Sequence, residues 1–228
     1  KHVIATMPAD TDIQKRNRAL VALTLLTGAR DSAIASMKLK HIDLQTGSVF
    51  QDARDVKTKR SKTFTTYFFP VGEDVRAIVD EWVMYLREEL LWGNDDPLFP
   101  ATLMECSSES RQFEVAGLNR KGWGSASSIR TIFKKAFESA GLPYFNPHSF
   151  RDTVVHLGET ICKSPEDFKA WSQNLGHEQV LTTFTSYGEV QPRRQAEIIQ
   201  GLGRPQVPGQ SSAEEIAEAV VRMMQAAK

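Results

Sequence analysis

Apolar residues recur at intervals of three and four along much of this chain, a period typical of helices with one buried face. The clearest such stripe, Val75, Val79, Trp82 and Leu86, lies within residues 73–91. The pattern predicts helices over residues 12–27, 31–37, 73–91, 125–139, 147–159, 165–174, 179–184 and 192–200. We therefore expect a mostly helical protein.

Between the second and third of these helices the pattern changes to one typical of strands. Residues 42–71 contain two turn sequences, 44–49 and 57–62, and an aromatic-rich run that ends at Pro70. Residues 93–124 are rich in Gly, Asn, Asp, Pro and Ser and are expected to be mostly loop. The predicted fold class is mainly α with a small antiparallel β-sheet (α+β).

Pro, Gly and Ser are concentrated near the C-terminus. We expect a main domain over 1–203, a linker over 204–212 and a short amphipathic tail helix over 213–228. The tail helix has too little apolar surface to form a core of its own.

Composition limits the class of protein without identifying it. The 228 residues, 41% of them hydrophobic, suffice for one substantial core, and no apolar run approaches the roughly 20 residues that span a bilayer. Cys106 and Cys162 are too few for a disulfide framework or a zinc site, which favours a soluble protein of a reducing compartment. The net charge of zero argues mildly against nucleic-acid binding, but the distribution of charge matters more.

Basic residues fall into two clusters. The first holds five within nine residues: Arg54, Lys57, Lys59, Arg60 and Lys62. The second is more spread: Arg120, Lys121, Arg130, Lys134 and Lys135. Each cluster fits either a DNA-binding patch or an ordinary solvated face.

A polar pair begins the helix expected at 147–159. Asn146 and Pro147 form a favourable helix start, so His148 and Arg151 share the face of its first turn. Free backbone N–H groups there favour an anion as ligand, whereas the simpler interpretation is a polar surface pair beside a helix cap.

Arg30 follows the glycine that ends the first predicted helix. An arginine there often only complements the terminal carbonyls. Together with Arg151, however, its guanidinium could grip two oxygens of a phosphodiester and stabilise the charge that builds up at phosphorus.

His177 and Tyr187 lie towards the end of the chain. Each could be a structural residue packed between helices or a catalytic one. Thr185, Ser186 and Gly188 surround Tyr187 and indicate an accessible segment. A tyrosine hydroxyl has a pKa of about 10, so a base or a positive field must activate it as a nucleophile. The hairpin lysines could protonate a leaving oxygen, or could simply solvate a turn.

Taken together, these residues resemble the catalytic domain of the tyrosine recombinase (phage integrase) family, from about Leu20 to Val190. The segment TGARDSAIASMKLKHIDL resembles the family's first box and contains Arg30. NPHSFRDT resembles the second box, and LGHEQVLTTFTSYGEV resembles the third stretch.

The resemblance implies the fold expected above and a set of catalytic residues. These are Arg30, Lys57 (with Lys59 as the alternative), His148, Arg151, His177 and the nucleophile Tyr187. It implies a 3′-phosphotyrosyl intermediate that needs no metal and no other cofactor. Expected DNA-binding residues are Arg54, Lys59, Arg60, Lys62, Arg120, Lys121 and Arg130.

Three departures from the family pattern stand out. Ala33 replaces the acidic residue that usually follows the first arginine by three positions. The stretch from His177 to Tyr187 is one residue longer than the commonest spacing. The hairpin offers Lys57, Lys59 and Lys62 where the family uses one catalytic lysine.

As partners, the resemblance implies double-stranded DNA at specific attachment sites and other recombinase protomers, as a tetramer on DNA that associates weakly without it. It also implies that the tail helix over 213–228 docks on a neighbouring protomer. It implies no membrane and a cytoplasmic, nucleoid-associated location in a bacterium or phage. About 20 residues precede the first box, so we expect a catalytic fragment without the family's N-terminal core-binding domain. A mobile-element integrase is the preferred role. The alternatives are a type IB topoisomerase-like nicking-closing enzyme and a non-catalytic DNA-binding relic of the fold.

Overall fold

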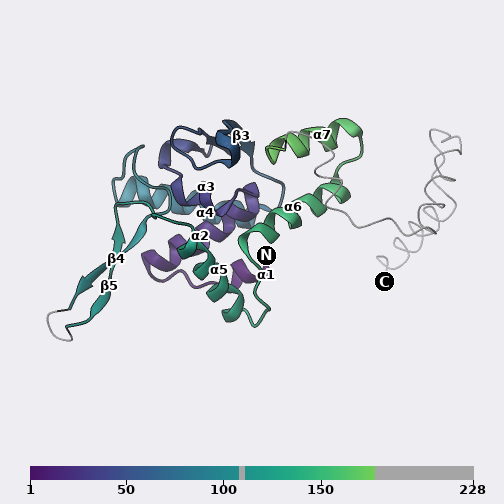
Figure 1. The fold of residues 1–228 in the computed structure, drawn as a ribbon. Helices are drawn as coiled ribbons and strands as arrows, with labels where there is room; N and C mark the ends of the chain where they lie inside the picture. The colour runs from purple at the N-terminus through teal and green to yellow at the C-terminus, as the bar shows by residue number, and fades with distance from the viewer. Residues whose placement is uncertain (108–110, 178–228) are drawn as a thin grey trace, which may run out of the picture. The chain divides into compact units, whose positions relative to one another are not determined.

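In this computed structural model, residues 1–107 and 111–177 are described (Figure 1). The helices expected at 179–184 and 192–200, the linker, the tail helix and Tyr187 lie outside these residues, so the expectations for them remain predictions.

The described chain alternates helices with short strands. In order the elements are α1 His2–Thr6, α2 Asp12–Thr27, α3 Asp31–Ser36, the 3₁₀ turn η1 Leu39–His41, β1 Ile42–Asp43, β2 Ser48–Gln51, the turn η2 Lys59–Ser61, β3 Phe64–Tyr67, α4 Glu73–Met84, the π-helical turn η3 Tyr85–Glu89, β4 Ala101–Cys106, β5 Phe113–Asn119, α5 Ser127–Ser139, α6 Pro147–Ile161 and α7 Pro165–Asn174. The expected class, mainly helical with small antiparallel sheets, is confirmed. Among the described helices, none combines the length and hydrophobicity that a bilayer crossing requires.

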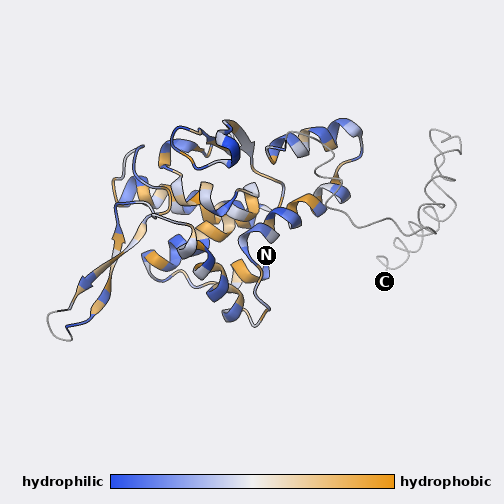
Figure 2. Cartoon of the chain, viewed as in Figure 1, coloured by the Kyte–Doolittle hydropathy of each residue, from blue (hydrophilic) through white to orange (hydrophobic). Residues whose placement is uncertain are grey.

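Helix α2 forms the centre of the core and packs against α4 and α6. Leu20, Val21, Ala22 and Leu23 are fully buried in succession, so this helix is enclosed on every side along its second half. Figure 2 shows apolar residues concentrated on α2, while the helices around it present hydrophilic residues on one side.

Local sequence explains where the helices near the site begin. Thr11 and Gln14 form a reciprocal capping box at the start of α2. The Asn146 side chain accepts a hydrogen bond from the Ser149 N–H, with Pro147 in the first turn of α6. The helix start expected around His148 is therefore confirmed.

The sheet expected over residues 42–71 is confirmed as an antiparallel three-stranded sheet in the order β1-β2-β3. Its edge strand β3 contacts the C-terminal end of α7. The Tyr67 N–H donates to the Asn174 side-chain oxygen at 2.7 Å, and the Asn174 amide donates back to the Tyr67 carbonyl at 2.9 Å. This pair of hydrogen bonds fixes the end of α7 against the sheet.

The expectation of mostly loop over 93–124 is wrong, because β4 and β5 pair there as an antiparallel hairpin (Figure 1). Met104, Phe113 and Val115 remain exposed on it. With no buried face, the strands show little of the alternation by which half-buried strands are recognised. The base of the hairpin is anchored by the buried Arg16, which donates to the Pro100 carbonyl at 2.8 Å.

Candidate active site

The TGAR segment is a helix terminus that turns the chain towards Arg30. Gly28 takes a left-handed conformation with φ of 57°, which a glycine adopts without strain. A Cβ atom at Gly28 would lie 2.9 Å from a methyl group of Leu175 and 3.7 Å from the Arg151 Cα. The turn therefore brings the first, second and third family segments into direct contact. Arg30 follows as the N-cap of α3 and is half-buried.

Arg151 on α6 is the most buried of the expected catalytic residues that the structure describes. It is 5% exposed, and its guanidinium donates to the Gly28 carbonyl at 2.9 Å and to the Leu175 carbonyl. Burial and, to a smaller extent, the nearby charge of Arg30 lower the pKa of Arg151 to about 10. A guanidinium has five N–H donors, so this one can tie two chain segments together and still face a ligand.

Two arginines that repel each other in a partly buried position indicate a site for an anion. Burial also lowers the pKa of Arg30. No described residue accepts a hydrogen bond from the Arg30 guanidinium, whereas Arg151 is held by two carbonyls. An anion bridging the two would relieve their repulsion and use the donors that remain.

His177 is delivered to the same place by the end of α7. Gly176 takes a φ of 72°, and a Cβ atom there would lie 2.7 Å from the Phe64 ring, so only glycine fits between α7 and β3. The His177 N–H donates to the Ser172 carbonyl at 3.1 Å, which closes the turn. His177 is half-buried.

The charge around His177 shows which residues converge. Burial, together with the charges of Arg151, Arg30, His148 and Lys59 in that order, lowers its pKa to about 4. Four residues from α6, the α2–α3 turn and the β2–β3 hairpin thus act on a single imidazole. His148 is exposed on the first turn of α6, with Nε2 3.8 Å from an Asp152 carboxylate oxygen.

We predict a specific pH dependence of stability from His177. An unfolded histidine takes up a proton below a pKa of about 6.5, whereas the folded protein resists protonating His177 until about pH 4. Between these values the unfolded state binds more protons, so His177 makes unfolding easier as pH falls. His177→Gln should therefore lose less stability than wild type between pH 6.5 and 4.5 in urea titrations. If the free energy of unfolding falls in parallel with pH for the two proteins, His177 does not have a lowered pKa in the folded state.

The hairpin lysines occupy different places. The Lys57 ammonium lies 3.5 Å from the Gly124 carbonyl, ahead of α5. Lys59 acts electrostatically on His177. The Lys62 ammonium lies 3.4 Å from the Gly176 carbonyl, beside the Phe64 ring. The general acid thus stays a prediction, with Lys57 favoured by sequence pattern and Lys59 by position.

Several of the expected DNA-binding arginines already have a carboxylate partner. Arg120 pairs with Asp96, and Arg130 donates to Asp31 at 2.9 Å. Arg54 likewise pairs with Asp52. Exposed ion pairs are weak, so a phosphate can replace the carboxylate, and the DNA-binding roles stay predictions.

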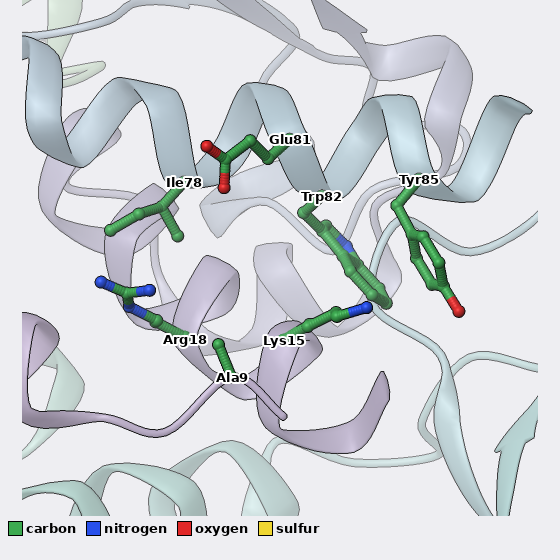
Figure 3. Close-up of a pocket in the computed structure, with 7 residues that line it drawn as sticks. All are labelled: Ala9, Lys15, Arg18, Ile78, Glu81, Trp82 and Tyr85. Atoms are coloured by element: carbon green, nitrogen blue, oxygen red, sulfur yellow. The ribbon is translucent and has the colours of Figure 1, made fainter. Parts of the chain in front are cut away.

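A pocket of about 290 Å³ lies apart from these residues, between the N-terminal half of α2 and α4 (Figure 3). Its lining residues are Ala9, Lys15, Arg18, Ile78, Glu81, Trp82 and Tyr85. The Tyr85 hydroxyl donates to Asp12 at 2.7 Å, and this bond, with burial, raises the pKa of Tyr85 to about 12. A raised pKa makes this tyrosine a poorer nucleophile. Among the described residues no group of three or more His, Cys, Asp or Glu is arranged to hold a metal ion.

Some groups that build the site lie within the family segments, but the sequence did not indicate their roles. The carbonyls of Gly28 and Leu175 orient Arg151, and backbone groups have no sequence signature. Ser32 and Ser36 contact the hairpin backbone at Lys57. Their spacing of four on one helix face was the only available hint.

Comparison with known proteins matches this arrangement to a family. Residues 2–194 match the phage integrase family, and the chain belongs to it. It is 27% identical over 182 residues to the tyrosine recombinase XerC of Lactobacillus leichmannii, covering 79% of this chain and 53% of that protein. The XerC of Halalkalibacterium halodurans is 26% identical over 185 residues, with coverage of 80% and 53%. The chain spans about half the length of these curated relatives.

Solved structures share the fold. XerA recombinase superposes with a TM-score of 0.57 at 20% identity, covering 90% of this chain and 61% of that one. The Tn1549 transposon integrase in complex with transposon right end DNA gives 0.56 at 12% identity, covering 89% and 63%. At such identities the likeness establishes the fold alone.

Proposed function

We propose that this chain is the catalytic domain of a site-specific DNA recombinase that cleaves and rejoins DNA through a 3′-phosphotyrosyl bond on Tyr187. The observation that carries the proposal is that the Arg151 guanidinium binds the Gly28 and Leu175 carbonyls and so brings together the segments of Arg30, Arg151 and His177. Membership of the phage integrase family supports it.

The proposed reaction starts with a DNA phosphodiester between the two arginines, above the first turn of α6. The positive end of the α6 dipole and both guanidinium groups favour its negative charge. A bound phosphate would also offset the charges that hold His177 neutral, so His177 could then donate a hydrogen bond to a phosphate oxygen.

In the chemical step the Tyr187 oxygen forms a bond to phosphorus and the bond from phosphorus to the 5′ oxygen breaks. His148, exposed at the mouth of this site, assists removal of the tyrosine proton. The departing 5′ oxygen keeps the electron pair and takes a proton from Lys57 or Lys59. Attack by a second 5′ hydroxyl on the phosphotyrosine reverses the step and joins a new partner.

The proposed substrate is double-stranded DNA at attachment sites, with protomers assembled as a tetramer on DNA. Among the structural neighbours, XerH is described bound to its difH substrate. Integration or excision of a mobile element in a bacterial cell remains the preferred role. Because the chain spans half of its curated relatives, these functions refer to the domain within a whole protein.

Type IB topoisomerase-like nicking and closing is not favoured, because the curated relatives are tyrosine recombinases. A non-catalytic relic is not favoured either, because the described catalytic candidates are present and gathered. Ala33 remains the departure from the family pattern.

The test is covalent capture. The protein is incubated with nicked duplexes of randomised flanking sequence. Cleavage next to the nick releases a short fragment that carries the 5′ hydroxyl, and its loss prevents rejoining and traps the protein–DNA adduct. We expect protein-linked DNA that survives denaturant, and sequencing of the linked strands gives the preferred site.

Two duplexes that carry this site then distinguish the functions. Strand exchange between them supports a recombinase, while relaxation of a supercoiled plasmid without exchange indicates the topoisomerase. The absence of any linked DNA from the randomised pool and from genomic attachment DNA would overturn the proposal.

A further inference from the structure

Helix α3 carries Arg30 at its start and contacts the lysine hairpin along one face. The Ser36 hydroxyl accepts a hydrogen bond from the backbone N–H of Lys57 at 2.8 Å. The Ser32 hydroxyl donates to the Lys57 carbonyl at 3.2 Å. Both polar backbone groups of one hairpin residue are thus held by two serines one helical turn apart.

The donor and acceptor roles in this contact are set within the helix itself. The Ser36 hydroxyl donates its own proton towards the Ser32 and Ala33 carbonyls, at 3.0 and 3.1 Å. Its lone pairs are therefore left to receive the Lys57 N–H.

The serine contacts lie where the hairpin leaves the core and its tip becomes exposed. Lys57 and Lys59 are exposed, and Arg60 and Ser61 take positive φ values of 57° and 52°. The neighbouring Val56 is buried at 2% exposure, so the chain first becomes exposed at Lys57, the residue that the serines hold.

We propose that Ser32 and Ser36 are positioning residues for the general-acid lysine. They clamp the hairpin backbone to the helix that begins at Arg30. These two hydrogen bonds fix the position of the lysine-bearing segment relative to Arg30, which is proposed to hold the phosphate. The lysine side chain remains able to reach the leaving oxygen. Ala33 lies between the serines, is buried at 1% exposure and has no polar side-chain group. The side-chain hydrogen bonds from α3 to the Lys57 backbone therefore come from the two serine hydroxyls. The inference rests on the proposed DNA cleavage.

A substrate whose leaving group needs no proton can distinguish a misplaced general acid from a general loss of structure. Only the first defect should disappear on such a substrate. When sulfur replaces the bridging 5′ oxygen, the thiolate departs unprotonated near neutral pH, because a thiol has a pKa of about 8.5. The test compares single-turnover adduct formation on the ordinary and the 5′-thio duplex, both built on the sequence captured with wild-type protein.

For Ser32→Ala combined with Ser36→Ala, we expect roughly ten- to a hundredfold slower adduct formation on the ordinary duplex and a near wild-type rate on the 5′-thio duplex. Lys57→Ala and Lys59→Ala are measured alongside, and the true general acid should show the same selective rescue. The double Ser→Thr variant keeps both hydroxyls and should restore the rate.

A matched control removes a helix hydroxyl elsewhere. Thr160 donates to the Leu157 carbonyl of its own helix, and Thr160→Ala should leave both rates unchanged. Equal slowing of the serine variant on both duplexes, or no slowing on either, would overturn the inference. Failure of wild-type protein to react with both duplexes would instead count against the proposed function.

Discussion

Tyr187→Phe is expected to abolish the covalent protein–DNA adduct entirely. The substitution removes one oxygen atom, and in the proposed reaction that oxygen is the nucleophile. DNA binding should persist, because the arginines and His177 that are proposed to hold the phosphate are unchanged. Denaturing gels of protein mixed with the nicked duplex measure the adduct, and a mobility-shift assay measures binding.

Tyr85→Phe provides the matched control. It removes the same atom from a tyrosine whose hydroxyl is engaged with Asp12 and whose pKa is raised to about 12. This variant should form the adduct at the wild-type level. Linked DNA in the Tyr187→Phe protein, or its loss in Tyr85→Phe, would show that the nucleophile has been misassigned.

The second large effect distinguishes the two arginines. Arg30→Ala and Arg151→Ala should each reduce adduct formation by at least 10²- to 10³-fold, roughly the cost of removing one preorganised donor from a transition state. Their effects on stability should differ. Arg151→Ala leaves the Gly28 and Leu175 carbonyls without their donor, which should cost about 2 kcal/mol.

Arg30→Ala should unfold at close to the wild-type temperature, because no described residue accepts a hydrogen bond from Arg30 and its charge disfavours that of Arg151. Thermal unfolding and adduct formation on the same preparations provide the comparison. Equal destabilisation by both substitutions would mean that Arg30 has a structural partner too, and an active Arg151→Ala protein would remove Arg151 from the site.

Much of the local structure could be predicted from the sequence, because it depends on neighbours a few positions apart. The period of apolar residues locates α2 and α5, and Asn146 with Pro147 marks the start of α6. The β4–β5 hairpin could not be predicted in this way, since its strands lack a buried face. A resemblance spread over three short motifs then indicated the family, which the comparison confirms.

The chemistry of the site depends on distances that no local pattern contains. Sequence indicated which arginines and histidines to examine, and it favoured Lys57 for the general acid. Only the folded chain places Lys59 within electrostatic reach of His177 and fixes Lys57 by its backbone to Ser32 and Ser36.

The sequence by itself therefore determined most of the helices, the three-stranded sheet and the family. The tertiary structure decided that Arg151 is a structural tie as well as a candidate phosphate ligand, and that His177 is held neutral. The physical reason is that helix period and capping act within one or two turns, whereas burial and electrostatic fields are sums over groups that folding brings together from distant parts of the chain.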